Sequence, residues 1–292
     1  MANRHFAKLA DVWKHLPLVA VLSIERPRHY WESHAGNALY SMVDDAERRY
    51  GALRFVDVAS AFPALARSRY IEHLQALNPS MPPLHRYPGS PLLAMTELGA
   101  AASYLFCDTD VGSVADLEAA ASRLGLEDCV RVVCSDGMTA LHESLVGVDG
   151  KVVAHIDPYD PWAQGPAGVS AVGLARELIQ RGVGLVYWYG YDGPEQRGWA
   201  FDELRESSSA AILWCGDVMI ASHEKAAFGG DLGDATTPGT GFGVVCANVS
   251  REAINACRRL GEELARAYDG IPLPDGMSGH LDFTVRFAPG SS

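Results

Sequence analysis

Acidic residues stand at or just after the ends of four apolar runs in this 292-residue chain. In chain order they and their neighbours are Glu32, His34, Gly36 and Asn37; Asp108 and Asp110; Asp136-Gly137; and Asp157-Pro158-Tyr159-Asp160. One such aspartate is commonly a turn former, but four acidic strand ends predict a shared edge. With its glycine turn, that edge suits a ligand that carries hydroxyls, an amino group or a cationic centre. A nucleoside fits, because an acid after the second run can accept from both ribose hydroxyls and the third Asp-Gly can lie beside an adenine amine.

The elements that would position these residues alternate between short apolar runs and helical patterns. Strands are predicted at 29–33, 103–107, 130–134, 151–156, 183–189, 211–215, 242–247 and 281–287, and helices at 7–23, 91–101, 113–124, 137–146, 168–182, 194–206 and 250–268. This alternation is typical of an α/β fold with a doubly wound, mostly parallel sheet, in which ligands bind outside the carboxyl ends of the strands. Two strands joined by a Gly-rich loop, and a last strand after the final helix, predict an antiparallel C-terminal edge.

Residues 43–88 depart from this alternation. They hold Arg-rich helical segments and end in a Pro-rich loop, "NPSMPPLHRYPGSP". We interpret them as a small helical subdomain inserted within a single domain that spans residues 1–292.

Composition narrows the classes of function. No run of eighteen apolar residues exists and the N-terminus has no apolar secretory segment, so neither a membrane span nor secretion is predicted. The six cysteines lack CxxC spacing and are interpreted as reduced thiols of a cytoplasmic protein, with no metal site. A net charge of −12 disfavours binding to nucleic acid, because a negative surface repels its phosphate backbone. Nothing in the sequence indicates an oligomeric state.

Five blocks resemble class I S-adenosylmethionine-dependent methyltransferases, and more narrowly the J-type large-subunit rRNA adenine-N6 methyltransferases. "ADVWKH" (10–15) is similar to that family's Ala-Asp-Val-Leu-Lys-His helix, and "YWESHAGNALY" (30–40) to its Tyr-Leu-Asp-Thr-His-Ala-Gly-Ala-Gly-Arg-Tyr strand and turn. "YPGSP" (87–91) matches its Tyr-Pro-Gly-Ser-Pro loop, while "SDGMTAL" and "HIDPYDP" stand where the family has Asp-Gly and Ile-Asp-Pro-Pro-Tyr. The blocks keep the family's order over nearly the whole chain. The resemblance implies a Rossmann-like methyltransferase fold, a helical insertion, and S-adenosyl-L-methionine as cofactor.

Carried over residue by residue, the resemblance also implies a site. The cofactor would be held by Lys14, His15, His34, Gly36, Ser90, Asp108, Asp136 and Gly137. The family has Glu at the ribose position, so the register there stays open between Asp108 and Asp110. Asp157 and the carbonyl of Pro158 would accept from the target amine and aim its lone pair at the methyl group, so that positioning does most of the catalysis.

Three departures touch the acceptor side. Tyr159 replaces the second Pro of the family motif and Asp160 replaces its stacking Tyr, which moves the aromatic platform to Tyr159 or Trp162. The N-terminal arm is shortened, and the charge is acidic. We therefore expect a divergent member that N-methylates a small nitrogenous molecule, with Asp157, Pro158 and Tyr159 at the catalytic site. The alternatives are an rRNA or nucleotide adenine-N6 methyltransferase and a non-catalytic S-adenosylmethionine- or nucleoside-binding protein.

Overall fold

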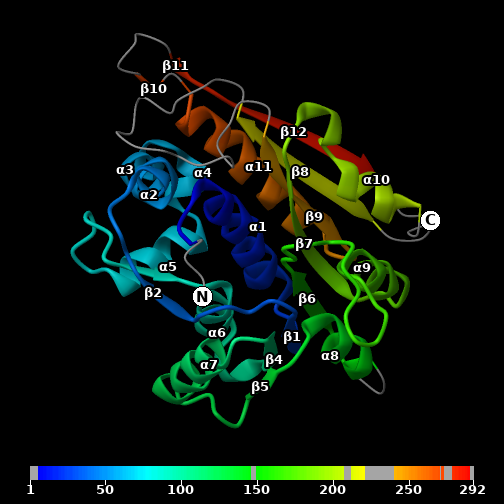
Figure 1. Ribbon diagram of the computed structural model, residues 1–292. Coiled ribbons are helices and arrows are strands. Elements are labelled where there is room, and N and C mark those ends of the chain that lie inside the picture. Colours follow the sequence, from blue (N-terminus) through cyan, green and yellow to red (C-terminus); the bar gives the residue numbers. More distant parts are fainter. Residues whose placement is uncertain are drawn as a thin grey trace.

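An eight-stranded sheet forms the centre of the molecule (Figure 1). The computed structural model describes residues 6–145, 149–206, 212–220, 240–269, 271–272 and 278–289. Within them the strand order is β12-β8-β9-β7-β6-β1-β4-β5. The strands are β1 (His29–Glu32), β4 (Ser103–Asp108), β5 (Val130–Cys134), β6 (Val152–Ile156), β7 (Gly184–Tyr191), β8 (Leu213–Ile220), β9 (Gly241–Ala247) and β12 (Leu281–Ala288).

The sheet is mostly parallel, as the alternation of elements predicted. The pairs β1–β4, β4–β5, β1–β6 and β6–β7 are all parallel. Strand β9 runs antiparallel to both β7 and β8, and β12 runs antiparallel to β8. The doubly wound fold with an antiparallel C-terminal part is confirmed, but β9 lies inside the sheet and β12 forms the edge. The Gly-rich loop predicted between β8 and β9 lies outside the described residues.

Helices cover both faces of the sheet (Figure 1). They are α1 (Leu9–Glu25), α6 (Ser90–Leu98), α7 (Val111–Arg123), α8 (Gly137–Ser144), α9 (Ala171–Gln180), α10 (Trp199–Arg205) and α11 (Arg251–Ala267). Buried side chains of α1, α6, α7 and α11 join one hydrophobic cluster, and those of α8, α9 and α10 join a second. Alternate residues of β1 supply both clusters, because successive strand side chains point to opposite faces: Tyr30 lies in the first and Trp31 in the second.

Local capping explains where several helices begin. Side chains of Asp110, Asp136, Ser170 and Ser250 accept hydrogen bonds from backbone N–H groups in the first turns of α7, α8, α9 and α11. These are preferred N-cap residue types, and each satisfies a donor that the helix itself leaves free. The helix predicted at 113–124 therefore begins at Val111, after its Asp110 cap.

The segment at 43–88 is mainly helical. It contains α2 (Ala46–Arg48), η1 (Arg49–Leu53), α3 (Arg54–Val58), η2 (Ala59–Ala61), α4 (Pro63–Ala66) and α5 (Arg69–Leu77). Its buried Tyr50, Phe55 and Tyr70 share the hydrophobic cluster of α1. That the segment is an inserted subdomain of one methyltransferase domain stays a prediction.

Short strands that the sequence patterns did not indicate complete the description. Strands β2 (Leu39–Ser41) and β3 (Arg86–Pro88) pair antiparallel, with Leu39 opposite Pro88. This pairing brings the loop at 89–90 beside the turn that follows β1. Strands β10 (Ile271–Pro272) and β11 (Ser278–Gly279) form a second small pair. None of the helices in the described part of the chain has the length and apolar character that a membrane crossing requires.

Candidate active site

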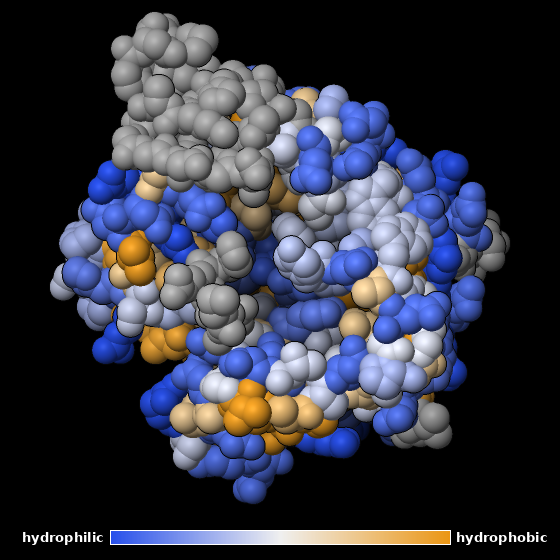
Figure 2. All heavy atoms as spheres, viewed as in Figure 1, coloured by the Kyte–Doolittle hydropathy of each residue, from blue (hydrophilic) through white to orange (hydrophobic). Residues whose placement is uncertain are grey.

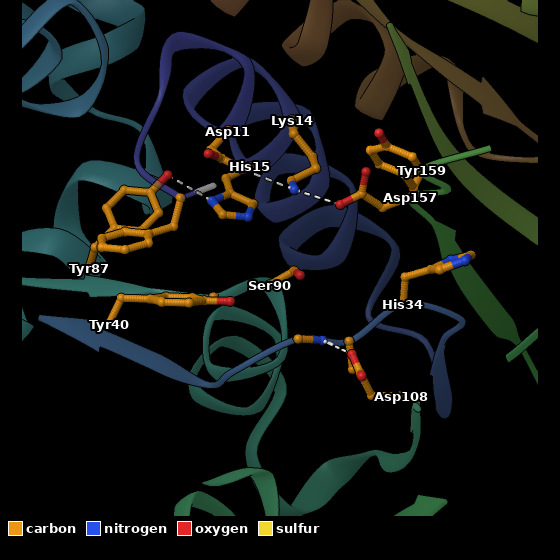
Figure 3. A pocket seen from close by; sticks show the side chains of 14 residues that line it. Asp11, Lys14, His15, His34, Tyr40, Tyr87, Ser90, Asp108, Asp157 and Tyr159 are labelled. Carbon is orange, nitrogen blue, oxygen red and sulfur yellow. Dashed lines mark hydrogen bonds and ion pairs between the residues drawn. The ribbon is translucent and has the colours of Figure 1, made fainter. Parts of the chain in front are cut away.

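A cavity of about 230 Å³ lies at the carboxyl ends of the central strands (Figure 3). Strand β1 has β4 on one side and β6 on the other, so the strand order reverses direction there, which is where ligands bind in such sheets. Most of the predicted site residues line the cavity: Lys14, His15, His34, Gly36, Ser90, Asp108, Asp157 and Tyr159. Figure 2 shows a recess with mostly hydrophilic walls near the centre of the view used in Figure 1.

The turn after β1 is anchored by an acid at the end of β4. Gly36 has a φ of 62°, which favours glycine, and its N–H donates to Asp108 Oδ2 over 2.7 Å. The other Asp108 oxygen accepts from the Asp110 N–H over 2.8 Å. Asp110 itself caps α7 by accepting from the Ser113 N–H over 2.8 Å. Asp108 therefore lines the cavity, whereas Asp110 caps the helix; which of them binds the ribose stays a prediction.

A buried ion pair joins α1 to the end of β6. Lys14 Nζ lies 2.6 Å from Asp157 Oδ2 and 3.0 Å from Asp11 Oδ1. Burial opposes the charge on Lys14, but Asp157 and Asp11 outweigh it and raise the pKa of Lys14 above its ordinary value. Burial also opposes the Asp157 carboxylate, but Lys14 and His155 lower the pKa of Asp157 below its ordinary value. Both partners are therefore charged at neutral pH.

The two cavity histidines are neutral. Burial, with Lys14 and His155 nearby, lowers the pKa of His15 well below its ordinary value, and its Nδ1 lies 3.0 Å from Tyr87 Oη. Burial also lowers the pKa of His34, although nearby carboxylates partly oppose the shift. Among the groups that line the cavity, carboxylates therefore outnumber the one charged lysine.

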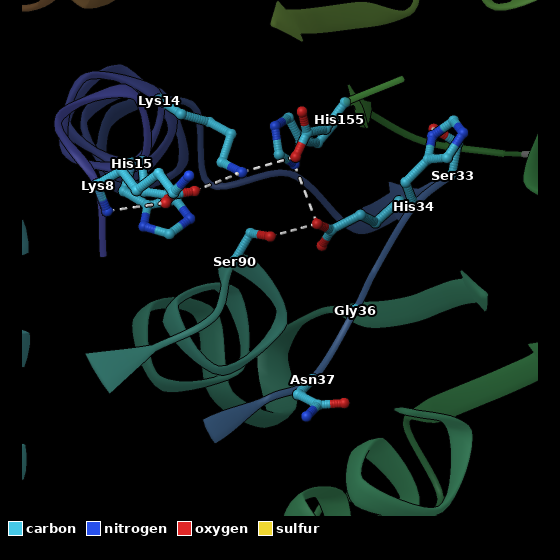
Figure 4. A network of polar contacts seen from close by, with 12 residues as sticks. Lys8, Lys14, His15, Ser33, His34, Gly36, Asn37, Ser90 and His155 are labelled. Atoms are coloured by element: carbon cyan, nitrogen blue, oxygen red, sulfur yellow. Dashed lines mark hydrogen bonds and ion pairs between the residues drawn. The ribbon is translucent and has the colours of Figure 1, made fainter. Parts of the chain in front are cut away.

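Glu32 does not face the cavity, contrary to its placement at the predicted acidic edge. It is fully buried and accepts hydrogen bonds from the Ser90 hydroxyl and, over 3.0 Å, from Tyr30 Oη. His155 Nδ1 lies 3.1 Å from the same carboxylate, and this ring is also fully buried (Figure 4). The network holds Ser90 in place at the start of α6.

Three predicted residues lie outside the cavity lining. Asp136 Oδ1 accepts from the Thr139 N–H and hydroxyl, over 2.8 and 2.7 Å, and so caps α8. A Cβ on Gly137 would lie 1.8 Å from the Ser33 carbonyl oxygen, so only glycine permits this approach to the turn after β1. Pro158 is buried, whereas the next residue, Tyr159, is exposed. Their roles toward cofactor and acceptor stay predictions.

Comparison with known proteins identifies the family. Residues 25–215 match the family model described as RsmJ: Ribosomal RNA large subunit methyltransferase D, RlmJ. The chain belongs to the RlmJ family. It is therefore a class I S-adenosylmethionine-dependent methyltransferase, and its cofactor is S-adenosyl-L-methionine.

One solved structure shares this fold over nearly the whole chain. The crystal structure of protein LPL1258 from Legionella pneumophila str. Philadelphia 1 superposes with a TM-score of 0.73 at 20% identity, over 98% of this chain and 99% of that one. The S-adenosylmethionine-dependent methyltransferase from Agrobacterium tumefaciens has a TM-score of 0.40 at 14% identity, over 81% of this chain and 61% of that one. No curated protein matches the chain.

The cavity of this RlmJ-family protein is lined by hydrogen-bond acceptors that fit its cofactor. S-adenosylmethionine carries a cationic sulfonium, an amino group and ribose hydroxyls, and carboxylates from Asp11, Asp108 and Asp157 line the space. At about 230 Å³ the cavity is smaller than the roughly 300–1,000 Å³ usual for small-molecule sites. The cavity can therefore enclose only part of the cofactor.

Several lining residues were not predicted as site residues. They are Phe6, Asp11, Ala35, Tyr40, Tyr87 and Gly89. Asp11, Tyr40, Tyr87 and Gly89 lie within the blocks that carried the family resemblance, so those blocks could have indicated them. Gly89 approaches the turn closely, since a Cβ there would lie 2.1 Å from the Asn37 carbonyl oxygen. His155 opens the quoted "HIDPYDP" stretch but precedes the part that matches the family motif, and its importance depends on a partner on another strand.

Proposed function

We propose that this RlmJ-family protein transfers the methyl group of S-adenosylmethionine to the N6 amine of an adenine in large-subunit ribosomal RNA. The observation that carries the proposal is the Asp157 carboxylate at the end of β6, held charged in the cavity wall by Lys14. The family description indicates large-subunit ribosomal RNA as the substrate. The resemblance of Asp157-Pro158 to the family motif indicates that the acceptor is an amine.

The two carboxylate oxygens of Asp157 can serve different partners, one binding Lys14 and the other the target amine. Lys14 uses Oδ2, and no hydrogen bond or ion pair to Oδ1 is found within the described residues, so Oδ1 can accept an N–H from the target amine. The Pro158 carbonyl would accept the second N–H. These two contacts turn the nitrogen lone pair toward the methyl group, and such orientation can supply a large share of the rate.

The cofactor supplies a methyl group on a positively charged sulfur. Transfer would form the N–C bond as the S–C bond breaks, leaving the electron pair on the sulfur of S-adenosylhomocysteine, and the methylated amine would release one proton to water. On the cofactor side, we propose that Asp108 accepts from the ribose hydroxyls and that Gly36, with Ser90 and His34, lies against the methionine part. Asp136 would accept from the cofactor's adenine amine.

A small nitrogenous acceptor is the second candidate. The observation that favours it is the net charge of −12, which repels a phosphate backbone. The family match weighs more, because it covers residues 25–215 and is described by an RNA substrate. We therefore rank the RNA alternative above the small molecule.

The test uses a large-subunit rRNA transcript and isotopically labelled cofactor. Digestion to nucleosides should yield labelled N6-methyladenosine. Asp157→Asn should lower kcat by about 100-fold, as expected for a lost preorganised electrostatic contact, while S-adenosylhomocysteine affinity by calorimetry stays nearly constant. Asp160→Asn is the matched control, since it removes a carboxylate three residues away and keeps a carbonyl acceptor for the turn.

These measurements distinguish the proposed reaction from its alternatives. Full activity in Asp157→Asn would remove this motif from the mechanism. Label found only on free nucleotides or small amines would favour the second candidate. Cofactor binding without any transfer would support the non-catalytic binding protein.

A further inference from the structure

Two exposed aromatic side chains follow Asp157 closely in the chain. In the described part of the chain, the exposed aromatic residues are Tyr159, Trp162 and Phe287. The first two belong to the segment that follows β6, and Phe287 lies on the edge strand β12. Among these three residues in the described part of the chain, Trp162 is the one whose ring lies against another aromatic ring, that of Trp199.

Trp162 rests on a second tryptophan that is firmly held. The two ring centroids, of Trp162 and Trp199, are 5.7 Å apart, with 38° between the ring planes. The Trp199 indole N–H donates to the Gly190 carbonyl over 3.1 Å. Its ring also meets buried Tyr189 edge-on at 5.3 Å. Trp199 is thereby fixed from behind, while Trp162 keeps 53% of its surface exposed.

Asp160 shapes the turn that presents Trp162. Its Oδ1 accepts from the N–H groups of Trp162 and Ala163, over 2.9 and 3.1 Å. The Pro161 carbonyl accepts from the Val172 N–H over 3.2 Å, which ties the segment to α9. Asp160 stands where the family motif has an aromatic residue. By forming this turn, Asp160 holds the ring of Trp162, two residues later, at the surface.

The tryptophan pair lies at the same sheet edge as the catalytic acid. Strands β6 and β7 are parallel neighbours, with Ile156 level with Tyr187. Neighbouring strands are about 4.8 Å apart. Gly190, which holds Trp199, stands three residues beyond Tyr187, or about 10 Å further along the strand. The pair therefore stands one strand away from Asp157, near the carboxyl end of β7.

We propose that Trp162, backed by Trp199, stacks on an unpaired base that flanks the target adenine. This inference rests on the proposed RNA substrate and deepens it. Stacking on an aromatic ring contributes about 1–3 kcal/mol per base and tolerates any base, because every base has a π face. It needs no cationic surface, which suits a protein with a net charge of −12. The partner is single-stranded RNA, bound with a shallow dependence on salt.

Binding and turnover are compared in Trp162→Ala, Trp162→Phe and Phe287→Ala. The probe is a purine-containing single-stranded oligoribonucleotide, measured by fluorescence anisotropy, and the substrate is the rRNA transcript. Trp162→Ala should weaken binding by about 5- to 150-fold and raise KM with little change in kcat. Trp162→Phe should keep most of the parent's affinity, because it retains an aromatic ring. Phe287→Ala removes an equally exposed ring at the far edge of the sheet and should change neither quantity.

Tryptophan emission provides a readout that does not depend on turnover. RNA should quench a component of the emission that is absent in Trp162→Phe, and a duplex of the same sequence should not. Unchanged affinity in Trp162→Ala with normal rRNA methylation would overturn the stacking role and leave the proposed function standing. Quenching at Trp162 without any rRNA methylation would support the stacking surface and count against the proposed function. Equal quenching by duplex and single strand would overturn the choice of partner.

Discussion

Replacement of Lys14 by methionine should destabilise the protein strongly. Methionine keeps most of the side-chain volume but removes the charge between Asp157 and Asp11. The Lys14 and Asp157 side chains are 13% and 20% exposed. The variant therefore leaves two mostly buried carboxylates without their shared cation.

The size of the loss follows from distance and burial. At 2.6 Å, with an effective dielectric constant of about 20, two unit charges attract by about 6 kcal/mol. Desolvation of both ions offsets part of this, and removing one partner of a buried pair typically costs about 3–5 kcal/mol. Because Asp157 keeps some contact with water, we expect about 3 kcal/mol. A domain with a usual stability of about 5–15 kcal/mol would remain folded.

Urea unfolding at pH 7 measures the loss by linear extrapolation. The matched control is Arg258→Met, which breaks a pair of similar length, 2.7 Å to Glu262, with side chains 59% and 44% exposed. That exposed pair on α11 should contribute about 0.5 kcal/mol or less. Adding Asp157→Asn to Lys14→Met should restore part of the stability, because it removes one uncompensated carboxylate.

The effect should also depend on pH. The pKa of Asp157 is lower in the folded protein, so its stabilisation is complete above the ordinary value of 3.8 and disappears as pH falls through the folded value. The difference between Lys14→Met and the parent should therefore shrink in strong acid. Equal losses for Lys14→Met and Arg258→Met, or no recovery in the double variant, would refute the reasoning from buried charge.

Three further outcomes can be checked separately. Asp108→Ala should weaken S-adenosylhomocysteine binding by about 1.5–3 kcal/mol in calorimetry, whereas Asp110→Ala should affect only the stability of α7; equal weakening by both would reopen the register. Gly137→Ala should destabilise the fold by about 1–3 kcal/mol in urea, because its Cβ would lie 1.8 Å from a backbone oxygen, while Gly173→Ala should cost less because the nearest atom is 3.3 Å away. Because the pKa of His34 is lowered from 6.5, the parent should lose stability as pH falls below about 6.5; His34→Asn should reduce that loss, and an unchanged profile would argue against a buried neutral ring.

The sequence by itself determined the elements and the family. Apolar runs and helical patterns are local, so strands such as 130–134 and helices such as 250–268 could be recognised without knowing their neighbours. The sequence blocks that resemble the family likewise predicted the cofactor and many of the residues that line the cavity. Lys14 and Asp157 were assigned from separate blocks, and the structure brings them to 2.6 Å.

Tertiary structure alone decided which acids face the cavity. Glu32 and Asp108 both stand at strand ends, yet Glu32 is buried against Ser90 and His155 while Asp108 lines the space. Asp110, two residues from Asp108, caps a helix. A residue's type and spacing do not specify the direction of its side chain relative to distant strands. Likewise, the insertion of β9 between β7 and β8, and the β2–β3 pairing behind the loop at 89–90, depend on hydrogen bonds between segments far apart in the chain.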